Sequence, residues 1–247
     1  MTKPTALVTG ANKGIGLEIA RQLGQKGYRV WLGCRDRGRG DEAVAELEKE
    51  GIEANTLALD VTDQASVNAA AQTLGSQIEA LDTLVNNAGM HIGFVGPISG
   101  ESVDDMRRIF DVNAFGPVRV TQALLPLLRR SEAARIVMMS SGLGSIASTL
   151  DPTSENWGVD FAGYSASKTA LNMFVAKFAR ELMADRIKVN AADPGLTATD
   201  LNGHMGQRSP EEGARIAVHL ATLDNIGPTG GFFHETSANP RPPRHPW

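Results

Sequence analysis

Cysteine is almost absent from this sequence, which has only Cys34 in 247 residues. A lone thiol excludes an internal disulfide framework and a zinc cluster built on several cysteines, and it fits a reducing cytoplasm. A basic excess is also missing, because 24 Lys and Arg stand against 28 Asp and Glu and the net charge is −4. Without that excess, the chain is a poor candidate for binding the backbone of a nucleic acid.

Long apolar runs are missing as well. Met1 to Thr5 lead directly into Ala6-Leu7-Val8 with no signal-like segment, and no stretch of about 18 apolar residues is available to span a bilayer. We therefore expect a cytoplasmic protein with no membrane partner. The five histidines lack metal-ligand spacing, so we expect no metal site. What is present is 42% hydrophobic residues, enough for one large domain with a sizeable core.

Short apolar or β-branched runs alternate along the chain with longer stretches of helical spacing. This alternation is typical of parallel strands joined by right-handed helical crossovers. We predict a single doubly wound α/β domain of Rossmann type, with a seven-stranded parallel sheet and helices on both faces. The predicted strands are 6–9, 29–34, 55–59, 81–86, 135–140, 187–192 and 231–233. The predicted helices are 14–26, 41–50, 63–79, 102–115, 118–130, 161–183 and 210–222.

Two segments do not fit the alternation of strands and helices. Residues 149–160 are polar and contain Pro152 and Gly158, which predicts an inserted loop within a domain of residues 1–236. Residues 237–247 form a proline-rich C-terminal tail. The tail is either a binding element or disordered, and disorder is favoured.

The first predicted strand leads into Thr9-Gly10-Ala11-Asn12-Lys13-Gly14-Ile15-Gly16 and then into an amphipathic helix. Glycines at such a strand-to-helix turn let a diphosphate approach bare N–H groups at the start of the helix. The alternative is an ordinary glycine-rich turn. Because the spacing is not that of a P-loop, a dinucleotide is favoured over a nucleoside triphosphate.

The end of the second predicted strand, Cys34-Arg35-Asp36, gives two conflicting indications of the cofactor. Asp36 lies 36 − 16 = 20 residues after Gly16, a spacing that suggests a carboxylate on the ribose of NAD(H). Arg35 and Lys13, by contrast, supply the cations that a 2′-phosphate needs. We favour NADP(H) and interpret Asp36 as a turn or helix-capping residue. The alternative for Lys13 and Arg35 is solvated surface charge.

Tyr164 and Lys168 lie four residues apart, so one helix would present both side chains on the same face. An ammonium group next to a phenol favours the phenolate, and we therefore expect the pKa of Tyr164 to be lowered from about 10. Ser140-Ser141 ends a predicted strand, where a hydroxyl could donate to a substrate carbonyl. The alternative is a surface Tyr/Lys pair, which the strand-end serines make the weaker interpretation.

These residues together resemble the short-chain dehydrogenase/reductase family, and Asn12-Lys13-Gly14-Ile15-Gly16 is similar to its NADPH-dependent carbonyl-reductase-like members. The resemblance extends from Thr9 to about Phe233. It includes Asp60-Val61, Asn86-Asn87-Ala88-Gly89, Asn113, Ser141, Tyr164-x-x-x-Lys168 and Pro194-Gly195-x-x-x-Thr199. In this family NADP-preferring members carry basic residues at positions that match Lys13 and Arg35.

The resemblance implies a catalytic tetrad of Asn113, Ser141, Tyr164 and Lys168. Tyr164 would be the general acid in reduction, and Ser141 would polarise the carbonyl. Lys168 would also hold the nicotinamide ribose, and Asn113 would support a proton relay. The cofactor-binding residues implied are Gly10, Asn12, Lys13, Gly14, Ile15, Gly16, Arg35, Asp60, Val61, Asn87, Ala88, Gly89, Tyr164, Lys168, Pro194, Gly195, Leu196 and Thr199.

The resulting prediction is an NADP(H)-dependent ketone or aldehyde reductase that is reversible as an alcohol dehydrogenase. One alternative is an NADP(H)-binding redox sensor without turnover, and another is a sugar-nucleotide epimerase or dehydratase. Substrate specificity is assigned to the loops 91–100, 149–160 and 200–210, where His91 and His204 are candidate contacts. A homodimer or homotetramer is expected, with a monomer left open by the long spacing of 164 − 141 = 23 residues between Ser141 and Tyr164.

Overall fold

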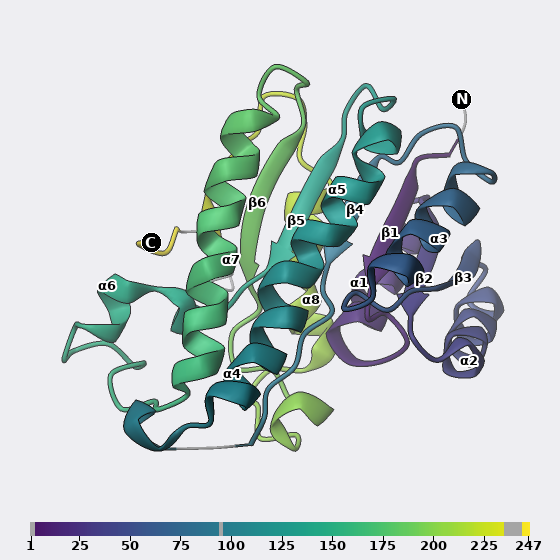
Figure 1. Ribbon diagram of the computed structural model, residues 1–247. Helices are drawn as coiled ribbons and strands as arrows, with labels where there is room; N and C mark the ends of the chain where they lie inside the picture. Colours follow the sequence, from purple (N-terminus) through teal and green to yellow (C-terminus); the bar gives the residue numbers. More distant parts are fainter. Residues whose placement is uncertain (1–2, 94–95, 235–243) are drawn as a thin grey trace.

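A sheet of seven parallel strands forms the centre of the computed structural model, which describes residues 3–93, 96–234 and 244–247 (Figure 1). The strand order is β3-β2-β1-β4-β5-β6-β7, so the direction in which successive strands are added to the parallel sheet reverses between β1 and β4. Ligands of such sheets bind at the carboxyl ends of the strands beside that reversal. The strands are β1 (Thr5–Thr9), β2 (Arg29–Cys34), β3 (Ala54–Ala58), β4 (Thr83–Asn86), β5 (Arg135–Met139), β6 (Lys188–Asp193) and β7 (Phe232–His234).

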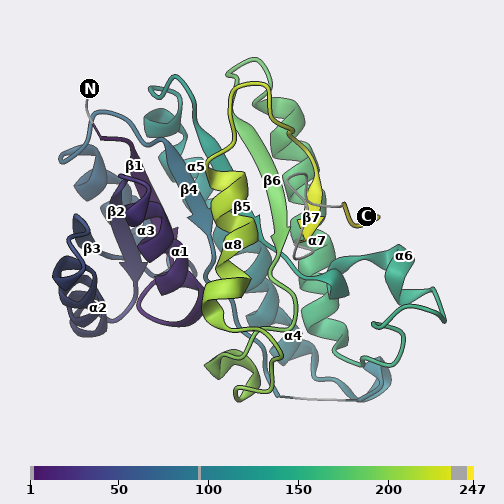
Figure 2. The same ribbon diagram turned by 180° about the vertical axis from the view of Figure 1, so that it is seen from behind.

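Helices cover both faces of the sheet, as the alternating pattern predicts. Figure 1 looks onto the face that carries α3, α4, α5 and α7, and Figure 2 looks onto the face that carries α1 and α8. The helices are α1 (Gly14–Gln25), α2 (Arg37–Lys49), α3 (Gln64–Gly75), α4 (Val103–Phe110), α5 (Gly116–Leu128), α6 (Ile146–Thr149), α7 (Ala162–Glu181) and α8 (Pro210–Ala221). The prediction of a single doubly wound α/β domain is therefore confirmed.

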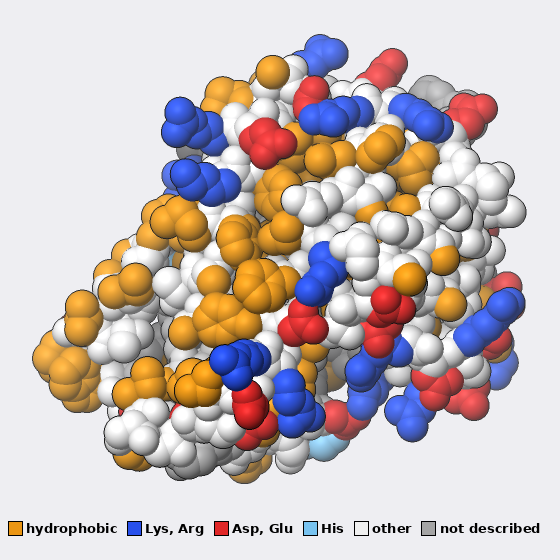
Figure 3. Space-filling model, viewed as in Figure 1, with side chains coloured by type: hydrophobic (Ala, Val, Ile, Leu, Met, Phe, Trp, Pro, Cys, Tyr) orange, Lys and Arg blue, Asp and Glu red, His pale blue; other side chains and the backbone are white. Residues whose placement is uncertain are grey.

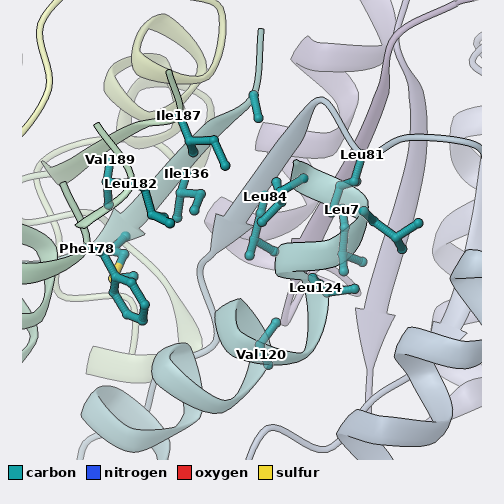
Figure 4. Close-up of a cluster of buried hydrophobic side chains, with 14 of the residues drawn as sticks. Leu7, Leu81, Leu84, Val120, Leu124, Ile136, Phe178, Leu182, Ile187 and Val189 are labelled. Carbon is teal, nitrogen blue, oxygen red and sulfur yellow. The ribbon is translucent and has the colours of Figure 1, made fainter. Parts of the chain in front are cut away.

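Alternation along the strands divides the core into two layers. In β1, Leu7 packs among residues of α3, α5 and α7, whereas its neighbours Ala6 and Val8 pack among residues of α1, α2 and α8. Leu84 and Val85 of β4 divide in the same way. Figure 4 shows the first layer, in which side chains from the strands meet those of α5 and α7. Since every central strand is buried on both faces, the sheet is a rigid base for its strand-end loops.

Several helix boundaries differ from the predicted ones for local reasons. Helix α2 begins at Arg37 rather than at 41, because the Asp36 carboxylate caps it by accepting from the Arg39 N–H at 3.1 Å. Helix α3 ends at Gly75, four residues before the predicted end. The predicted helices 102–115 and 118–130 are α4 and α5, which a π-helical turn at Asp111–Phe115 joins without a break.

The polar segment 149–160 runs from the end of α6 to the start of α7. Its far end is held by a parallel bridge between Gly96 and Phe161 and by the Gly96 N–H, which donates to the Asp160 carbonyl. The Glu101 carboxylate accepts from the Gly163 N–H at 2.8 Å and so secures the first turn of α7. The segment is therefore anchored at the base of the helix that carries Tyr164. Residues 94 and 95 of the neighbouring loop lie outside the described residues.

The predicted C-terminal tail is only partly described, since residues 235–243 lie outside the described residues. The last four residues, Arg244 to Trp247, which we call the C-terminal segment, lie against β7. Arg244 forms an antiparallel bridge with Phe233, and the His245 N–H donates to the Phe232 carbonyl at 2.8 Å. For these four residues the expectation of disorder is wrong, because they add to the edge of the sheet.

The face that α4, α5 and α7 cover, which Figure 1 looks onto, is rich in exposed apolar side chains. Figure 3 shows hydrophobic side chains gathered on this face, where Val103 of α4, Phe115 and Met173 of α7 are about half exposed or more. Within the described ranges, no helix is both long and apolar enough to cross a membrane.

Candidate active site

The four residues of the predicted tetrad come from three separate elements. Ser141 follows β5, Tyr164 and Lys168 lie in the first two turns of α7, and Asn113 lies in the π-helical turn before α5. The Ser141 side chain lies close enough to the Tyr164 hydroxyl to lower the Tyr164 pKa, and Lys168 Nζ lies 5.6 Å from the centroid of the Tyr164 ring. Ser140 instead donates to the Asn172 side chain at 2.7 Å. The structure thus places Ser141, not Ser140, beside Tyr164.

Asn113 is fully buried, and its amide connects the loop after β4 to α7. Its Oδ1 accepts from the Met90 N–H at 2.8 Å, and its Nδ2 donates to the Met90 carbonyl and to Ser167 Oγ. A Cβ atom at Gly89 would lie 3.6 Å from Asn113 Oδ1 and 3.9 Å from Lys168 Nζ. Gly89 therefore leaves open the space between the Asn113 amide and the Lys168 ammonium group.

Lys168 is buried, with 4% of its surface exposed, and its Nζ donates to the Met139 carbonyl at 2.7 Å. Burial lowers the pKa of Lys168 to about 8, and the negative charge of Asp193 opposes this change only in part. A buried ammonium is costly, and it is held here by a carbonyl at the end of β5. The site thus contains a lysine that exchanges its proton near neutral pH.

The pKa of Tyr164 moves in the direction opposite to the expected one. Burial, and after it the charge of Asp193, raise the pKa of Tyr164 to about 12, while the hydrogen bond with Ser141 offsets only part of the rise. The expected lowering is wrong for this structure, because burial and the charge of Asp193 raise the pKa by more than Ser141 lowers it. Tyr164 therefore holds its proton at neutral pH.

The glycine-rich loop packs tightly against the end of β4. Gly10 has a φ of +63°, and a Cβ atom there would lie 2.9 Å from Ala88 Cα. The Asn87 side chain donates to the Thr9 and Gly10 carbonyls at 2.9 and 3.2 Å. A Cβ atom at Gly16 would overlap this amide group. Asn87 and Ala88, predicted to line a ribose, thus also support the loop that turns into α1.

The start of α1 fits the binding of an anion. Helix α1 begins at Gly14, and its N-cap residue, Lys13, makes no side-chain hydrogen bond to the first turn. Asn12 and Ile15 are partly buried on either side of this point. The free N–H groups and the dipole of a helix N-terminus favour a phosphate at this position.

The predicted adenosine end gathers residues from the ends of β2 and β3. Burial would raise the pKa of Asp60, but hydrogen bonds from the Thr62 N–H and hydroxyl and the charge of Arg35 outweigh it and hold that pKa below its usual value. Arg35 is exposed, and Val61 is buried beside Gly116. Asp36 is occupied as the cap of α2, which confirms the capping interpretation.

Lys13 does not lie with Arg35. Its ammonium pairs with Asp200, which also pairs with His204 at 2.8 Å. Lys13 and Asp200 are both more than half exposed, so this pair contributes little to stability.

The loop after β6 brings the predicted nicotinamide contacts next to the glycine-rich loop. Gly195, after Pro194, has a φ of +69°, and its N–H donates to Asp193 Oδ1 at 3.0 Å. Leu196 is exposed at 58%, and Thr199 lies 3.6 Å from where a Cβ atom of Gly14 would be. This loop therefore faces the start of α1 across the carboxyl edge of the sheet.

Sequence reasoning missed two residues that the structure places at the site. Asp193, the last residue of β6, is 8% exposed and affects the pKa of both Tyr164 and Lys168. Its carboxylate at a strand end was a usable signal. The second is His245, whose Nε2 lies 2.7 Å from Asp193 Oδ2. A proline-rich tail gave no signal for it.

Comparison with known proteins decides the family. The model of the family described as short chain dehydrogenase matches residues 4–210. The chain belongs to the short-chain dehydrogenase family. This confirms the resemblance found in the sequence and makes the protein an oxidoreductase of the carbonyl/alcohol class.

Reductases are among the relatives of this short-chain dehydrogenase. The (−)-isopiperitenone reductase of Mentha piperita is 35% identical, over 94% of this chain and 96% of the relative. The structure of NADPH-bound carbonyl reductase from chicken fatty liver has a TM-score of 0.83 and 28% identity, covering 95% of this chain and 97% of that one. The structure of salutaridine reductase from Papaver somniferum has a TM-score of 0.81 and 28% identity, covering 95% of this chain and 100% of that one.

Proposed function

We propose that this short-chain dehydrogenase reduces a ketone or an aldehyde to an alcohol with NADPH. The observation that carries the proposal is the grouping of Ser141 and the buried Lys168 around the Tyr164 side chain, with Lys168 one helical turn from Tyr164. NADPH, when bound, supplies a hydride, which adds two electrons to the carbonyl carbon. The chain's own residues must then supply one proton to the carbonyl oxygen.

Tyr164 is the proton donor in this proposal. Its pKa of about 12 keeps the hydroxyl protonated at neutral pH, which suits an acid that acts in the direction of reduction. Ser141 positions the carbonyl oxygen by donating a hydrogen bond to it. Lys168, with a pKa of about 8, returns a proton to the phenolate and exchanges it with solvent near neutral pH. Asn113 would order a water beside Lys168, next to the opening at Gly89.

The strand ends fit a dinucleotide. Gly10 and Gly16 allow no side chain without overlap with their neighbours, and the start of α1 presents its N–H groups. We assign the diphosphate to the loop Gly10–Gly16, including Asn12 and Ile15. Further contacts are assigned to Asp60 and Val61 for the adenine, to Asn87–Gly89 for the ribose, and to Pro194, Gly195, Leu196 and Thr199 for the nicotinamide.

NADP(H) is proposed over NAD(H) because of the charges at the end of β2. Asp36 is engaged in capping α2, so its carboxylate is directed to a backbone N–H rather than to a ribose. Arg35 is exposed next to Asp60 and offers a cation for a 2′-phosphate. Lys13 can join it only by leaving Asp200, and that exposed pair is weak enough to exchange.

The substrate side of the proposed site carries an aromatic wall. The His91 ring lies 4.7 Å from the Phe161 ring and 5.8 Å from the Tyr164 ring, both edge to face. Burial lowers the pKa of His91 despite the charge of Glu101, so the imidazole is neutral at neutral pH. Its Nδ1 is buried and has no hydrogen-bond partner in the described part of the chain. We infer a small carbonyl compound with an apolar body.

The assembly and the location of the protein stay predictions. The exposed apolar face over α4 and α7 supports a homodimer or homotetramer joined by helices, which sedimentation velocity would test. A cytoplasmic location is proposed from the single, buried Cys34.

The test is oxidation of NADPH and of NADH with a panel of aromatic ketones, aliphatic diketones and aldehydes. The Tyr164→Phe variant is measured in parallel. Tyr28→Phe is a matched control, because Tyr28 is the only other tyrosine in the chain. We expect activity with NADPH that Tyr164→Phe abolishes and Tyr28→Phe retains. Tight NADPH binding without turnover of any carbonyl would instead support the redox-sensor alternative.

Cofactor choice is tested separately with Arg35→Ala. This variant should raise the KM for NADPH by about tenfold or more, since a charge-assisted pair with a phosphate is lost. The KM for NADH should stay unchanged. Equal effects on both cofactors would refute the assignment of Arg35 to the 2′-phosphate.

A further inference from the structure

The C-terminal segment brings an imidazole to the end of β6. His245 Nε2 lies 2.7 Å from Asp193 Oδ2, and both side chains are largely buried, with 15% and 11% exposed. Asp193 Oδ1 accepts at the same time from the Gly195 N–H at 3.0 Å. The carboxylate therefore connects the C-terminal segment to the loop that carries the proposed nicotinamide contacts.

A series of rings fixes the C-terminal segment in place. The His245 ring stacks on His234 at 4.2 Å and packs against Phe232 at 4.6 Å, and Trp247 stacks on Phe232 at 5.8 Å. Arg244 lies over the Phe233 ring at 5.2 Å and bridges to its backbone. Because Phe232 belongs to the main core, the position of His245 is set by the core of the domain.

The Asp193 carboxylate also lies close to the loop after β5 that carries Ser141. A Cβ atom at Gly142, the residue after Ser141, would lie 3.1 Å from Asp193 Oδ2, 3.3 Å from Asn156 Nδ2 and 3.5 Å from His245 Cε1. Three side chains from β6, the inserted loop and the C-terminal segment thus converge on the loop that carries Ser141. A larger side chain at residue 142 would therefore have to displace the Asp193 or Asn156 side chain by a few tenths of an ångström.

We propose that His245 is a positioning residue of the active site, which holds the Asp193 carboxylate and so sets the negative charge that Tyr164 and Lys168 experience. The negative charge of Asp193 raises the pKa of both residues. For Tyr164 it adds to the larger effect of burial, and for Lys168 it opposes that effect. A donor on Asp193 Oδ2 moderates that charge. The inference rests on the proposed function for the role of Tyr164.

Other ionisable groups lie around the pair and share its electrostatics. Asp193 and His245 are close enough to affect the pKa of His234, on β7, whose lowering is caused first by burial. The remaining groups with charge effects there are Glu155 and Arg208. Variants that test the pair of Asp193 and His245 should therefore leave His234, Glu155 and Arg208 unchanged.

The test follows the ionisation of Tyr164 directly. In a Tyr28→Phe background Tyr164 is the only tyrosine, so tyrosinate absorbance up to about pH 11 reports it alone. His245→Ala should move the curve to higher pH and Asp193→Asn to lower pH. Each change should alter the ionised fraction at a fixed pH by about threefold or more. His245→Gln, which keeps a donor, should stay near the parent, and the exposed His219→Ala is the control.

A second readout needs neither cofactor nor turnover. Trypsin can cut after Arg244, and Asp193→Asn should speed that cut by about tenfold, because a charged hydrogen-bond partner of the C-terminal segment is lost. An unchanged cleavage rate would overturn the contact. A His245→Ala curve that coincides with the parent, or moves in the same direction as Asp193→Asn, would overturn the positioning role. If Asp193→Asn does not fold, the comparison of His245→Ala with His245→Gln decides.

Both readouts are separate from the proposed function. Failure of every carbonyl with NADPH would refute the reductase proposal and leave the ionisation curves of Tyr164 intact. Loss of the expected shifts with full reductase activity would refute the role of His245 alone.

Discussion

Replacement of Lys168 by methionine should change the pH dependence of stability by a predictable amount. Lys168 is 4% exposed, and burial, partly opposed by Asp193, lowers its pKa from 10.5 to about 8. This lowering of the Lys168 pKa from 10.5 to about 8 corresponds to about 3 kcal/mol of unfavourable free energy for the buried ammonium at neutral pH. Methionine has a similar length and no charge, so Lys168→Met removes this cost.

The sign follows from proton binding. At pH 7 both the folded and the unfolded chain carry the Lys168 proton, and the full cost is present. As the pH rises from 8 towards 10.5, the folded state releases the proton while the unfolded state keeps it, so the free energy of unfolding of the wild type rises. Between about pH 7 and pH 9.5 the wild type should gain about 2 kcal/mol relative to Lys168→Met.

Urea denaturation at several pH values measures this difference. Losing the hydrogen bond to the Met139 carbonyl adds a constant offset of about 1–3 kcal/mol, which does not depend on pH. Lys177→Met on the exposed side of α7 is the matched control for the loss of one lysine charge from the same helix. A pH-independent difference for Lys168→Met would refute the reasoning that a buried cation costs stability here.

Three further substitutions or treatments test other parts of the structure. Asp36→Ala removes the cap of α2 and should lower the free energy of unfolding by about 1 kcal/mol in chemical denaturation. Gly10→Ala places a Cβ atom 2.9 Å from Ala88 Cα at a φ of +63°, so it should cost about 1–3 kcal/mol and weaken NADPH binding measured by fluorescence. Burial, with the charges of Asp41 and Asp36, raises the pKa of the Cys34 thiol to about 11. A disulfide reagent at about pH 8 should therefore react about 100-fold more slowly with the native protein than with the unfolded chain, and comparable rates would contradict this.

The fold could be predicted because its causes are local and repeated. Each strand is a short apolar run, and each crossover has helical spacing, so the parallel sheet follows from the pattern. Boundaries were predicted less well where one contact decides them. The Asp36 cap starts α2 four residues earlier than the apolar pattern suggests. The π-helical turn at Asp111–Phe115 carries α4 directly into α5, which no periodicity indicates.

The candidate site divides in the same way between local spacing and long-range contacts. Tyr164 and Lys168 could be paired from their spacing on one helix, and Ser141 from its place at a strand end. The direction in which the Tyr164 pKa shifts could not be predicted, because it depends on burial and on Asp193. Asp193 lies 193 − 164 = 29 residues further along the chain. The pairing of Lys13 with Asp200 could not be predicted either, because it joins loops that follow β1 and β6 and lie far apart in the sequence.

The bridge between Arg244 and Phe233 has a consequence for how molecules of this protein can associate. Strand β7 is an edge of the sheet, and an edge with free backbone groups is a template on which another chain can add a strand. Here the Phe232 carbonyl is already occupied by the His245 N–H. A second molecule could extend the sheet at this edge only by displacing the C-terminal segment, and with it the imidazole on Asp193. Growth of the sheet and the arrangement at Asp193 therefore exclude each other.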